Sequence, residues 1–372
     1  MSTIKFDYNN LLIVPKVNTE ISSRYKDIIL PDILPLFTAP MDTVVNLSNK
    51  DVFLKNKIQV VLPRTVSYGQ FLANEILSGK TNDDGVFVSL GMEDMERHYR
   101  SNFKDFHKSA HILIDVANGH MQKIVDIARE LRRLRPDVTL MVGNIANPET
   151  YRWYAQNNCA DYIRVGIGNG NGCLTTKQSG VGYPNASLIQ ETYKVKQEFI
   201  KEQEENVRFN SSTLGGLIQR RVITRIPAIV ADGGMQNYVD VIKALASGAD
   251  YVMMGSIFNK AFESCADNYV FGIKVGENIA GRCFKMKIPV TKHFRGMSTK
   301  EAQKAMGKTR LKTSEGVTRY RKVEYHLSGW VENFEHYLRN AMSFSDAKTL
   351  EDFIGKADIC QITDKAYDRF NK

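Results

Sequence analysis

The sequence has few cysteines and none of the spacings that would make them structural. Its 372 residues include only Cys159, Cys173, Cys265, Cys283 and Cys360, and no two of them form a C-x-x-C pair. This irregular spacing argues against a disulfide framework and against a zinc ribbon. We therefore expect a protein of the reducing cytoplasm.

Long apolar runs and basic blocks are also missing. The N-terminus has no charged start followed by an apolar run, and no stretch of about eighteen apolar residues occurs, so neither an export signal nor a membrane partner is predicted. The formal net charge is +9, but acids and bases are mixed, as in 196–208. Scattered charge without interleaved aromatics argues against a nucleic-acid partner and favours small phosphorylated ligands.

Eight short apolar runs are present, and helical patterns separate them. The runs are continuous rather than alternating, which is typical of parallel strands covered on both faces. Eight β-then-α units predict an α/β protein with the fold of a (β/α)8 TIM barrel. The runs are 36–40, 58–64, 85–91, 111–119, 139–145, 161–168, 226–234 and 250–258.

Two segments are longer than a βα repeat requires. Residues 185–225 combine a charged helical stretch with a polar piece, 209–216. Residues 269–330 contain a β-rich basic run, 282–296, and then a helical and irregular piece. We expect one catalytic barrel over 1–372, with an extended connection at 185–225 and a finger and mobile flap inserted after the eighth strand.

The loop 166-GIGNGNGCLTTKQSGVGYP-184 holds six glycines around one cysteine. It follows the sixth predicted strand, so in a barrel it lies at the catalytic mouth. A doubly wound dinucleotide-binding fold is the alternative, but its glycine fingerprint closes the first strand and opens a helix at once. Here we expect about ten polar residues before the next helix.

Cysteine and hydroxyl side chains in this loop are the first candidates for chemistry. Cys173 is flanked by glycines, so we interpret it as an exposed nucleophile. Cys159, Cys265 and Cys360 lie in helical or apolar patterns and are expected to be buried hydrophobes. Thr175 could serve a leaving group or cap a turn.

Glycines at the ends of the last two strands suit a phosphate. Asp232-Gly233-Gly234 follows the seventh strand, and Gly255-Ser256 follows the eighth. Barrels hold phosphates at this place with loop amides and the start of a short helix. The pattern therefore predicts a phosphorylated ligand.

Motifs along nearly the whole chain resemble the IMP dehydrogenase and GMP reductase family. GVGYP, DVANG, GMS and SEG are most similar to GMP reductases, and no Arg-Tyr pair of the dehydrogenase flap precedes SEG. Besides the cysteine loop, the matching motifs are 6-FDYNNLLIVPK-16, 37-FTAPMDTV-44, 115-DVANGH-120, 142-VGNI-145, 231-ADGG-234, 295-RGMS-298, 314-SEG-316 and 341-AMSFSDAKTL-350.

The resemblance implies an oxidoreductase of purine metabolism that converts GMP to IMP and ammonia with NADPH. Cys173 would attack C2 of guanine and form a thioimidate, while Thr175 and Glu315 would manage the protons. A homotetramer is also implied. The implied substrate residues are Asn171, Asp232, Gly233, Gly234, Gly255, Ser256, Gly296, Met297, Ser298, Lys312, Ser314 and Gly316. The implied cofactor residues are Arg64, Asp115, Val116, Ala117, Ile167 and Gly168, and a potassium ion would bind the carbonyls of Gly168, Gly170 and Cys173.

The chain departs from the family pattern at a few of these positions. Asn169 and Asn171 replace a proline and a phosphate-binding serine, Thr176 replaces an arginine of animal reductases, and Pro63-Arg64 replaces His-Lys. Two alternatives stay open: an IMP dehydrogenase without its regulatory module, which would oxidise IMP to XMP with NAD, and a purine-nucleotide-binding barrel without catalysis.

Overall fold

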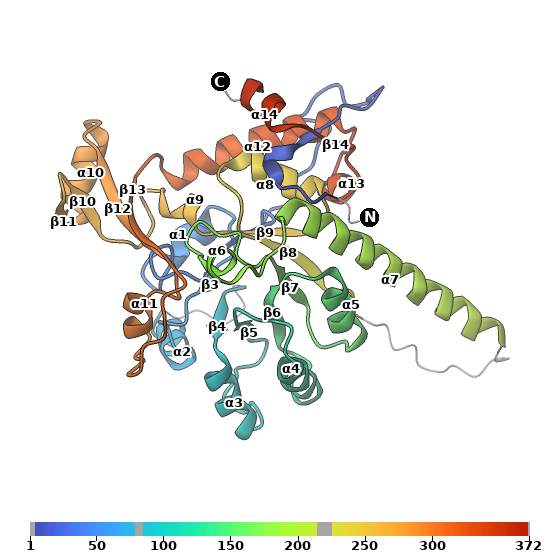
Figure 1. Cartoon of the computed structure of the whole chain (residues 1–372), viewed down its shortest axis with the longest axis horizontal. Helices are drawn as coiled ribbons and strands as arrows, with labels where there is room; N and C mark the ends of the chain where they lie inside the picture. The colour runs from blue at the N-terminus through green and yellow to red at the C-terminus, as the bar shows by residue number, and fades with distance from the viewer. Residues whose placement is uncertain (1–3, 79–84, 214–224, 371–372) are drawn as a thin grey trace.

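Eight parallel strands form a ring in the computed structural model, which describes residues 4–78, 85–213 and 225–370 (Figure 1). The strands follow one another in the order β2-β9-β8-β7-β6-β5-β4-β3. The ring closes at Gln59, whose amide donates to Leu36 O and whose carbonyl accepts from Thr38 N, both at 2.9 Å. The predicted TIM barrel is confirmed. Its strands are β2 (Leu36–Thr38), β3 (Val61–Leu62), β4 (Phe87–Leu90), β5 (His111–Asp115), β6 (Thr139–Ile145), β7 (Tyr162–Val165), β8 (Ala228–Asp232) and β9 (Tyr251–Met254).

The barrel interior is packed with side chains from every strand. Phe37, Phe87 and Tyr162 meet edge to face there, with ring centroids 5.6 to 5.8 Å apart. Leu113 and Met141 are fully buried among them. Because a second, larger core covers the outer face of the same strands, both faces need apolar residues, and the sequence runs are continuous.

Helices cover the outside of the ring (Figure 1). In the helix that begins at Gln122, the residues at helical spacing, Ile124, Ala128 and Leu131, are buried against the strands. None of the described helices is long and apolar enough to cross a membrane. The outer helices are α1 (Lys50–Lys55), α2 (Tyr68–Leu77), α3 (Met92–Arg100), α4 (Gln122–Leu134), α5 (Pro148–Gln156), α7 (Asn185–Thr213), α8 (Tyr238–Ala246) and α12 (Leu327–Phe344).

A finger stands beside the barrel after the eighth strand, as predicted (Figure 1). Its four antiparallel strands follow the order β11-β10-β12-β13, and α10 (Glu277–Lys285) packs on one face. The prediction of a β-rich run from residue 282 was wrong at its start, because residues 282–285 end α10 and bury Cys283 against the finger sheet. The strands are β10 (Asn268–Val270), β11 (Ile273–Val275), β12 (Val290–Arg295) and β13 (Thr318–Lys322).

The connection at 185–225 begins with the 29-residue helix α7, which extends past its neighbour α5 (Figure 1). Arg152 of α5 ties the two helices together through ion pairs to Glu198 at 2.8 Å and Glu202 at 2.6 Å. The predicted polar piece at 209–216 is helical through Thr213, and its remainder lies outside the described residues.

The two ends of the chain lie side by side against the barrel. The turn η1 (Tyr8–Asn10) leads into β1 (Leu11–Ile13), which pairs antiparallel with β14 (Ile359–Gln361). Lys243 of α8 is buried and donates to the carbonyl of Tyr8 at 3.0 Å, so the N-terminal segment is fixed to an outer helix. The short helices α13 (Leu350–Phe353) and α14 (Asp364–Phe370) complete this region.

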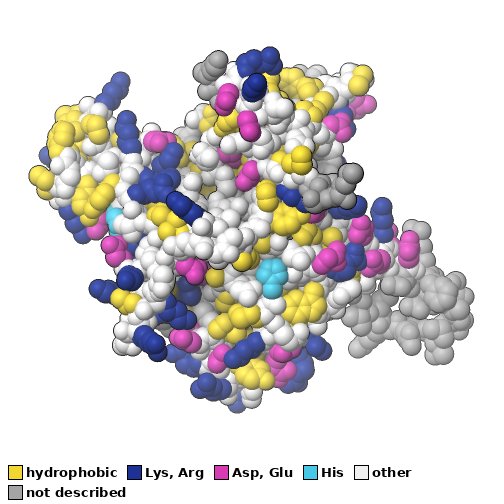
Figure 2. Space-filling model, viewed as in Figure 1, with side chains coloured by type: hydrophobic (Ala, Val, Ile, Leu, Met, Phe, Trp, Pro, Cys, Tyr) yellow, Lys and Arg dark blue, Asp and Glu magenta, His cyan; other side chains and the backbone are white. Residues whose placement is uncertain are grey.

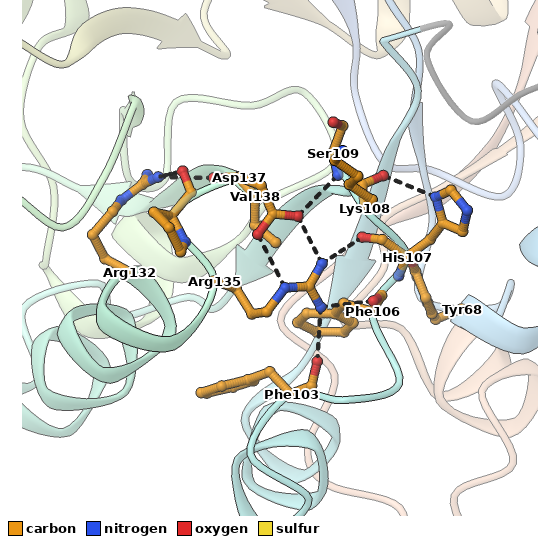
Figure 3. A network of polar contacts seen from close by, with 11 residues as sticks. Tyr68, Phe103, Phe106, His107, Lys108, Ser109, Arg132, Arg135, Asp137 and Val138 are labelled. Atoms are coloured by element: carbon orange, nitrogen blue, oxygen red, sulfur yellow. Dashed lines mark hydrogen bonds and ion pairs between the residues drawn. The ribbon is translucent and has the colours of Figure 1, made fainter.

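Arg135 joins two loops at the amino-terminal end of the barrel (Figure 3). Its guanidinium donates to the carbonyls of Phe103, Phe106 and His107 at 2.7 to 3.1 Å. It also pairs with both oxygens of Asp137, at 3.0 and 2.8 Å. This bidentate contact, together with the amide of Ser109, outweighs burial, which on its own would raise the pKa, and lowers the pKa of Asp137 to about 2.

We predict that Asp137→Asn lowers the free energy of unfolding by about 1 kcal/mol near neutral pH, since a charge-assisted bidentate pair is lost. The native pKa lies below the ordinary value of 3.8, so the ionised carboxylate stabilises the fold fully above 3.8 and loses this effect as pH falls toward about 2. Urea denaturation of wild type and variant across that window measures it. Asp126→Asn, on the exposed face of α4, is the control, and a constant difference at all pH values would contradict the assignment.

Candidate active site

A cavity of about 240 Å³ opens at the carboxyl ends of the barrel strands. Five segments reach it: the cysteine loop after β7, the loops after β5, β8 and β9, and the flap, which is the segment 296–317 between β12 and β13. Most residues predicted for the site therefore meet in one place. The cavity is lined by Arg64, Asp115, Val116, Ala117, Ile167, Gly168, Gly170, Asn171, Cys173, Thr175, Asp232, Gly233, Gly234, Gly255, Ser256, Gly296, Met297 and Ser298.

Cys173, Thr175 and Glu315 form a hydrogen-bonded chain beside this cavity. The Cys173 Sγ donates to Thr175 Oγ1 at 3.1 Å, and Thr175 Oγ1 donates to Glu315 Oε2 at 3.2 Å. The backbone reinforces the arrangement, because Leu174 N donates to Glu315 O at 2.7 Å. A thiol, a hydroxyl and a carboxylate in series provide a path for a proton away from sulfur.

Residues 166–174 separate β7 from helix α6 (Thr175–Ser179), in agreement with the predicted gap of about ten residues. Gly180, at φ 72°, ends this short helix. Gly168, at φ 81°, approaches this helix so closely that a Cβ would lie 1.7 Å from Thr176 Oγ1. Only glycine fits there, which explains part of the glycine content.

The flap continues the backbone pairing of the cysteine loop. Val317 N donates to Gly172 O at 3.2 Å, Gly296 N donates to Val317 O at 3.1 Å, and Cys173 pairs with Gly316. A Cβ on Gly296 would lie 2.4 Å from Gly172 O, so the segments are in tight contact. The carboxylate of Glu315 is thus positioned by backbone bonds rather than by side-chain packing.

Three flap residues predicted to bind substrate, Lys312, Ser314 and Gly316, do not line the cavity. The side chain of Gln303 bonds to both the amide and the carbonyl of Lys312, at 2.7 and 3.1 Å. Ser314 Oγ donates to Gly316 O at 3.1 Å. In this arrangement these contacts shape the flap itself.

A buried arginine at the floor of the cavity was missed by the sequence analysis. Arg164 of β7 donates to Asp115 Oδ1 at 2.7 Å and to Asp232 Oδ2 at 2.8 Å. Arg64 pairs with the other oxygen of Asp115 at 3.0 Å, and Asn144 donates to Asp232 Oδ2 at 2.7 Å. A lone arginine within the apolar run 161–168 was the available signal, since a charge in a buried strand needs partners.

The charges in this network control one another's ionisation. Burial on its own would raise the pKa of Asp115, but Arg64 and Arg164 outweigh it and hold the pKa below the ordinary value. Burial would likewise lower the pKa of Arg164, but Asp232 and Asp115 raise it. The ionised forms of Asp115 and Arg164 are therefore favoured, and the two arginines of the network match its two aspartates in number.

A cradle of small residues and amides also lines the cavity. Asn171 Nδ2 donates to Ser256 Oγ at 3.0 Å, and Ser256 is the first residue of α9 (Ser256–Asn259). Asn185 Nδ2 fixes the adjacent loop by donating to Gly233 O at 2.6 Å. Gly255 packs under Met41, and a Cβ would lie 2.5 Å from its sulfur. Amides and hydroxyls in this geometry suit a phosphate.

A second cavity, of about 600 Å³, shares Arg64 with the first. The loops after β3 and β4 and the flap residues Met306 and Gly307 line it. Together the two cavities leave room for a ligand longer than a mononucleotide.

The predicted potassium site consists of backbone carbonyls rather than side chains. One of these, Gly170 O, accepts from Cys173 N at 2.9 Å and keeps a second lone pair.

The remaining cysteines differ in exposure. Cys159 is buried as predicted, and burial raises its pKa to about 12. Cys265 is half-buried with its thiol directed at Asp42 O, and burial raises its pKa to about 12 as well. The prediction that Cys360 is buried was wrong, because β14 belongs to a sheet of only two strands and the Cys360 side chain is exposed to solvent.

The comparisons with known proteins agree on one family. The model described as the IMP dehydrogenase / GMP reductase domain matches residues 88–208 and 218–369. The GMP reductase of Caenorhabditis elegans is 26% identical over 340 residues, covering 91% of this chain and 83% of the relative. That of Escherichia coli O81 (strain ED1a) is 28% identical over 345 residues (91% and 86%), and GMP reductase 2 of Bos taurus is 28% identical over 347 residues (89% and 85%).

We predict that iodoacetamide modifies Cys173 and Cys360 and leaves Cys159 and Cys265 unmodified. Cys360 is exposed and the half-buried Cys173 lines the cavity, whereas burial raises the pKa of Cys159 and Cys265 to about 12 and keeps their thiols protonated. Mass spectrometry of tryptic peptides after brief treatment measures this, with Cys360 as the internal reference. A Cys173 that stays unmodified while Cys360 reacts would contradict an open pocket.

Proposed function

Because the chain belongs to the IMP dehydrogenase and GMP reductase family, we propose that it is a GMP reductase, which converts GMP to IMP and ammonia with NADPH. The observation that carries the proposal is the hydrogen-bonded chain from Cys173 through Thr175 to Glu315. A protein that only binds nucleotide has no use for a thiol poised next to a hydroxyl and a carboxylate. The similarity to relatives named GMP reductase supports the same proposal.

The nucleotide would bind with its phosphate in the cradle of Gly233, Gly234, Gly255 and Ser256. Asp232 would hold the ribose: Asn144 and Arg164 both donate to its Oδ2, so Oδ1 remains for hydroxyl groups. Gly296, Met297 and Ser298 reach the same cavity from the flap and would contact the purine. This pose places the base between the flap and Cys173.

In the first step, the Cys173 sulfur would attack C2 of guanine. The thiol proton would pass to Thr175 Oγ1 while the Thr175 proton moves to Glu315, following the direction of the two hydrogen bonds. The same pair would return a proton to the amino group, so that ammonia leaves C2 and a covalent thioimidate remains. Splitting the substitution into two steps lowers each barrier.

In the second step, the C–S bond breaks and C2 gains hydrogen. NADPH, when bound, supplies the hydride. Arg64, Asp115, Val116, Ala117, Ile167 and Gly168 would hold it, and the second cavity offers room for its distal part. The proposal extends to a potassium ion on the carbonyls of Gly168, Gly170 and Cys173, which are hard oxygen donors, and to a cytoplasmic homotetramer.

Following NADPH absorbance with GMP tests the reaction, and Cys173→Ala is expected to abolish turnover while GMP binding survives. The thiol is needed for the covalent step, but the cradle does not depend on it. A variant that keeps more than about a tenth of the wild-type rate would rule out the nucleophile, since covalent catalysis supplies several kcal/mol. Faster NADH production from IMP and NAD would instead indicate an IMP dehydrogenase.

Glu315→Gln is expected to lower ammonia release by about a hundredfold or more, with GMP affinity changed little, because the proton relay ends at this carboxylate. Glu324→Gln, which removes a half-exposed carboxylate paired with Lys260, is the matched control. Ammonia measured by a coupled assay, together with GMP binding, separates the two effects. Equal losses of rate and affinity would assign Glu315 to binding.

A further inference from the structure

Two arginines on the finger contact residues that line the cavity, and neither forms an ion pair within the described residues. Arg319 and Arg321 are two positions apart on β13, so they share one face of the strand. They lie opposite Phe294 and Lys292 of β12, and Phe294 lines the cavity. This face of the finger is therefore directed toward the barrel.

The guanidinium groups of the two arginines make few hydrogen bonds. Arg319 Nη2 donates to the carbonyl of Asn171 at 2.6 Å. The guanidinium of Arg321 lies 4.8 Å from the ring centre of Phe294, and its buried Nε has no hydrogen-bond partner within the described residues. Neighbouring cations differ: Arg295 pairs with Asp42 and Lys260 with Glu324. Unlike them, neither β13 arginine forms an ion pair with a carboxylate in the described part of the chain.

The unpaired charge is unfavourable as it stands. Burial lowers the pKa of Arg321, the like charge of Arg319 lowers it further, and the nearby charge of Glu324 offsets these effects only in part. Figure 2 shows Lys and Arg side chains gathered where the finger meets the barrel. Two guanidinium groups on one face of a strand, neither of them in an ion pair, are stabilised when an anion binds between them.

The cradle has no positive charge of its own to add to its amides and hydroxyls. Both arginines that line the cavity, Arg64 and Arg164, are neutralised by aspartates at its floor. Helix α9 has four residues, so its dipole is small. Asn171 links the cradle to the finger, because its side chain contacts Ser256 and its carbonyl contacts Arg319.

We propose that Arg319 and Arg321 complete the phosphate site and bind the 5′-phosphate of the purine nucleotide, an inference that rests on the proposed function. The barrel supplies neutral amides and hydroxyls, and the finger supplies the charge. The finger thereby distinguishes a nucleotide from its nucleoside. Because β13 directly follows the flap, binding the phosphate also holds Glu315 near Thr175.

The test compares the binding of GMP, IMP and guanosine by calorimetry in Arg319→Gln and in the double variant with Arg321→Gln. We expect GMP and IMP affinity to fall about tenfold or more, since charge-assisted hydrogen bonds are lost, and guanosine affinity to stay unchanged. Lys322→Gln removes an exposed charge from the other face of β13 and is the control, expected to bind as wild type. Arg319 is exposed, so its variant is expected to fold.

Unchanged GMP affinity in the double variant would overturn the proposal. Equal losses for GMP and guanosine would assign the arginines to finger structure, and a loss for NADPH alone would assign them to the cofactor; either result overturns it too. The proposed function has a separate readout. If wild type binds GMP in an arginine-dependent way but does not turn it over with NADPH, the phosphate site stands and the reductase assignment fails.

Discussion

The buried guanidinium of Arg164 connects the strand ends on which the site depends. It bridges Asp115 at the end of β5 and Asp232 at the end of β8, and Arg64 and Asn144 extend the bridge to the β3 loop and β6. Breaking such a buried pair costs about 3–5 kcal/mol, because a charge is left without compensation. The network therefore fixes the positions of the residues proposed to hold the ribose and the cofactor.

The cysteine loop and the flap complete the site through backbone contacts. Close approaches at Gly168 and Gly296 leave no room for a side chain, so the loop can follow the flap closely. The resulting bonds at Gly172, Leu174 and Val317 place Glu315 beside Thr175. Catalytic geometry in this protein is consequently set by segments that are far apart in sequence and lack apolar periodicity.

Charge is divided between the barrel and the finger. The barrel floor is neutral overall, because each arginine there is matched by an aspartate. The finger brings Arg319 and Arg321 into contact with the cavity residues Asn171 and Phe294 without ion pairs to either arginine among the described residues. The net charge of +9 by itself indicates only that anionic partners are favoured. The structure shows where two of the basic residues lie relative to the cavity.

The sequence by itself determined the eight strands, since burial on both faces demands continuous apolar runs. It also determined which loops lie at the carboxyl ends of the barrel strands, and that Cys173 lies in one of them. It did not reveal Arg164, the exposure of Cys360 or the contact from Arg319 to Asn171. These features depend on which distant segments meet, and a side chain's partners are set by tertiary packing rather than by its neighbours in sequence.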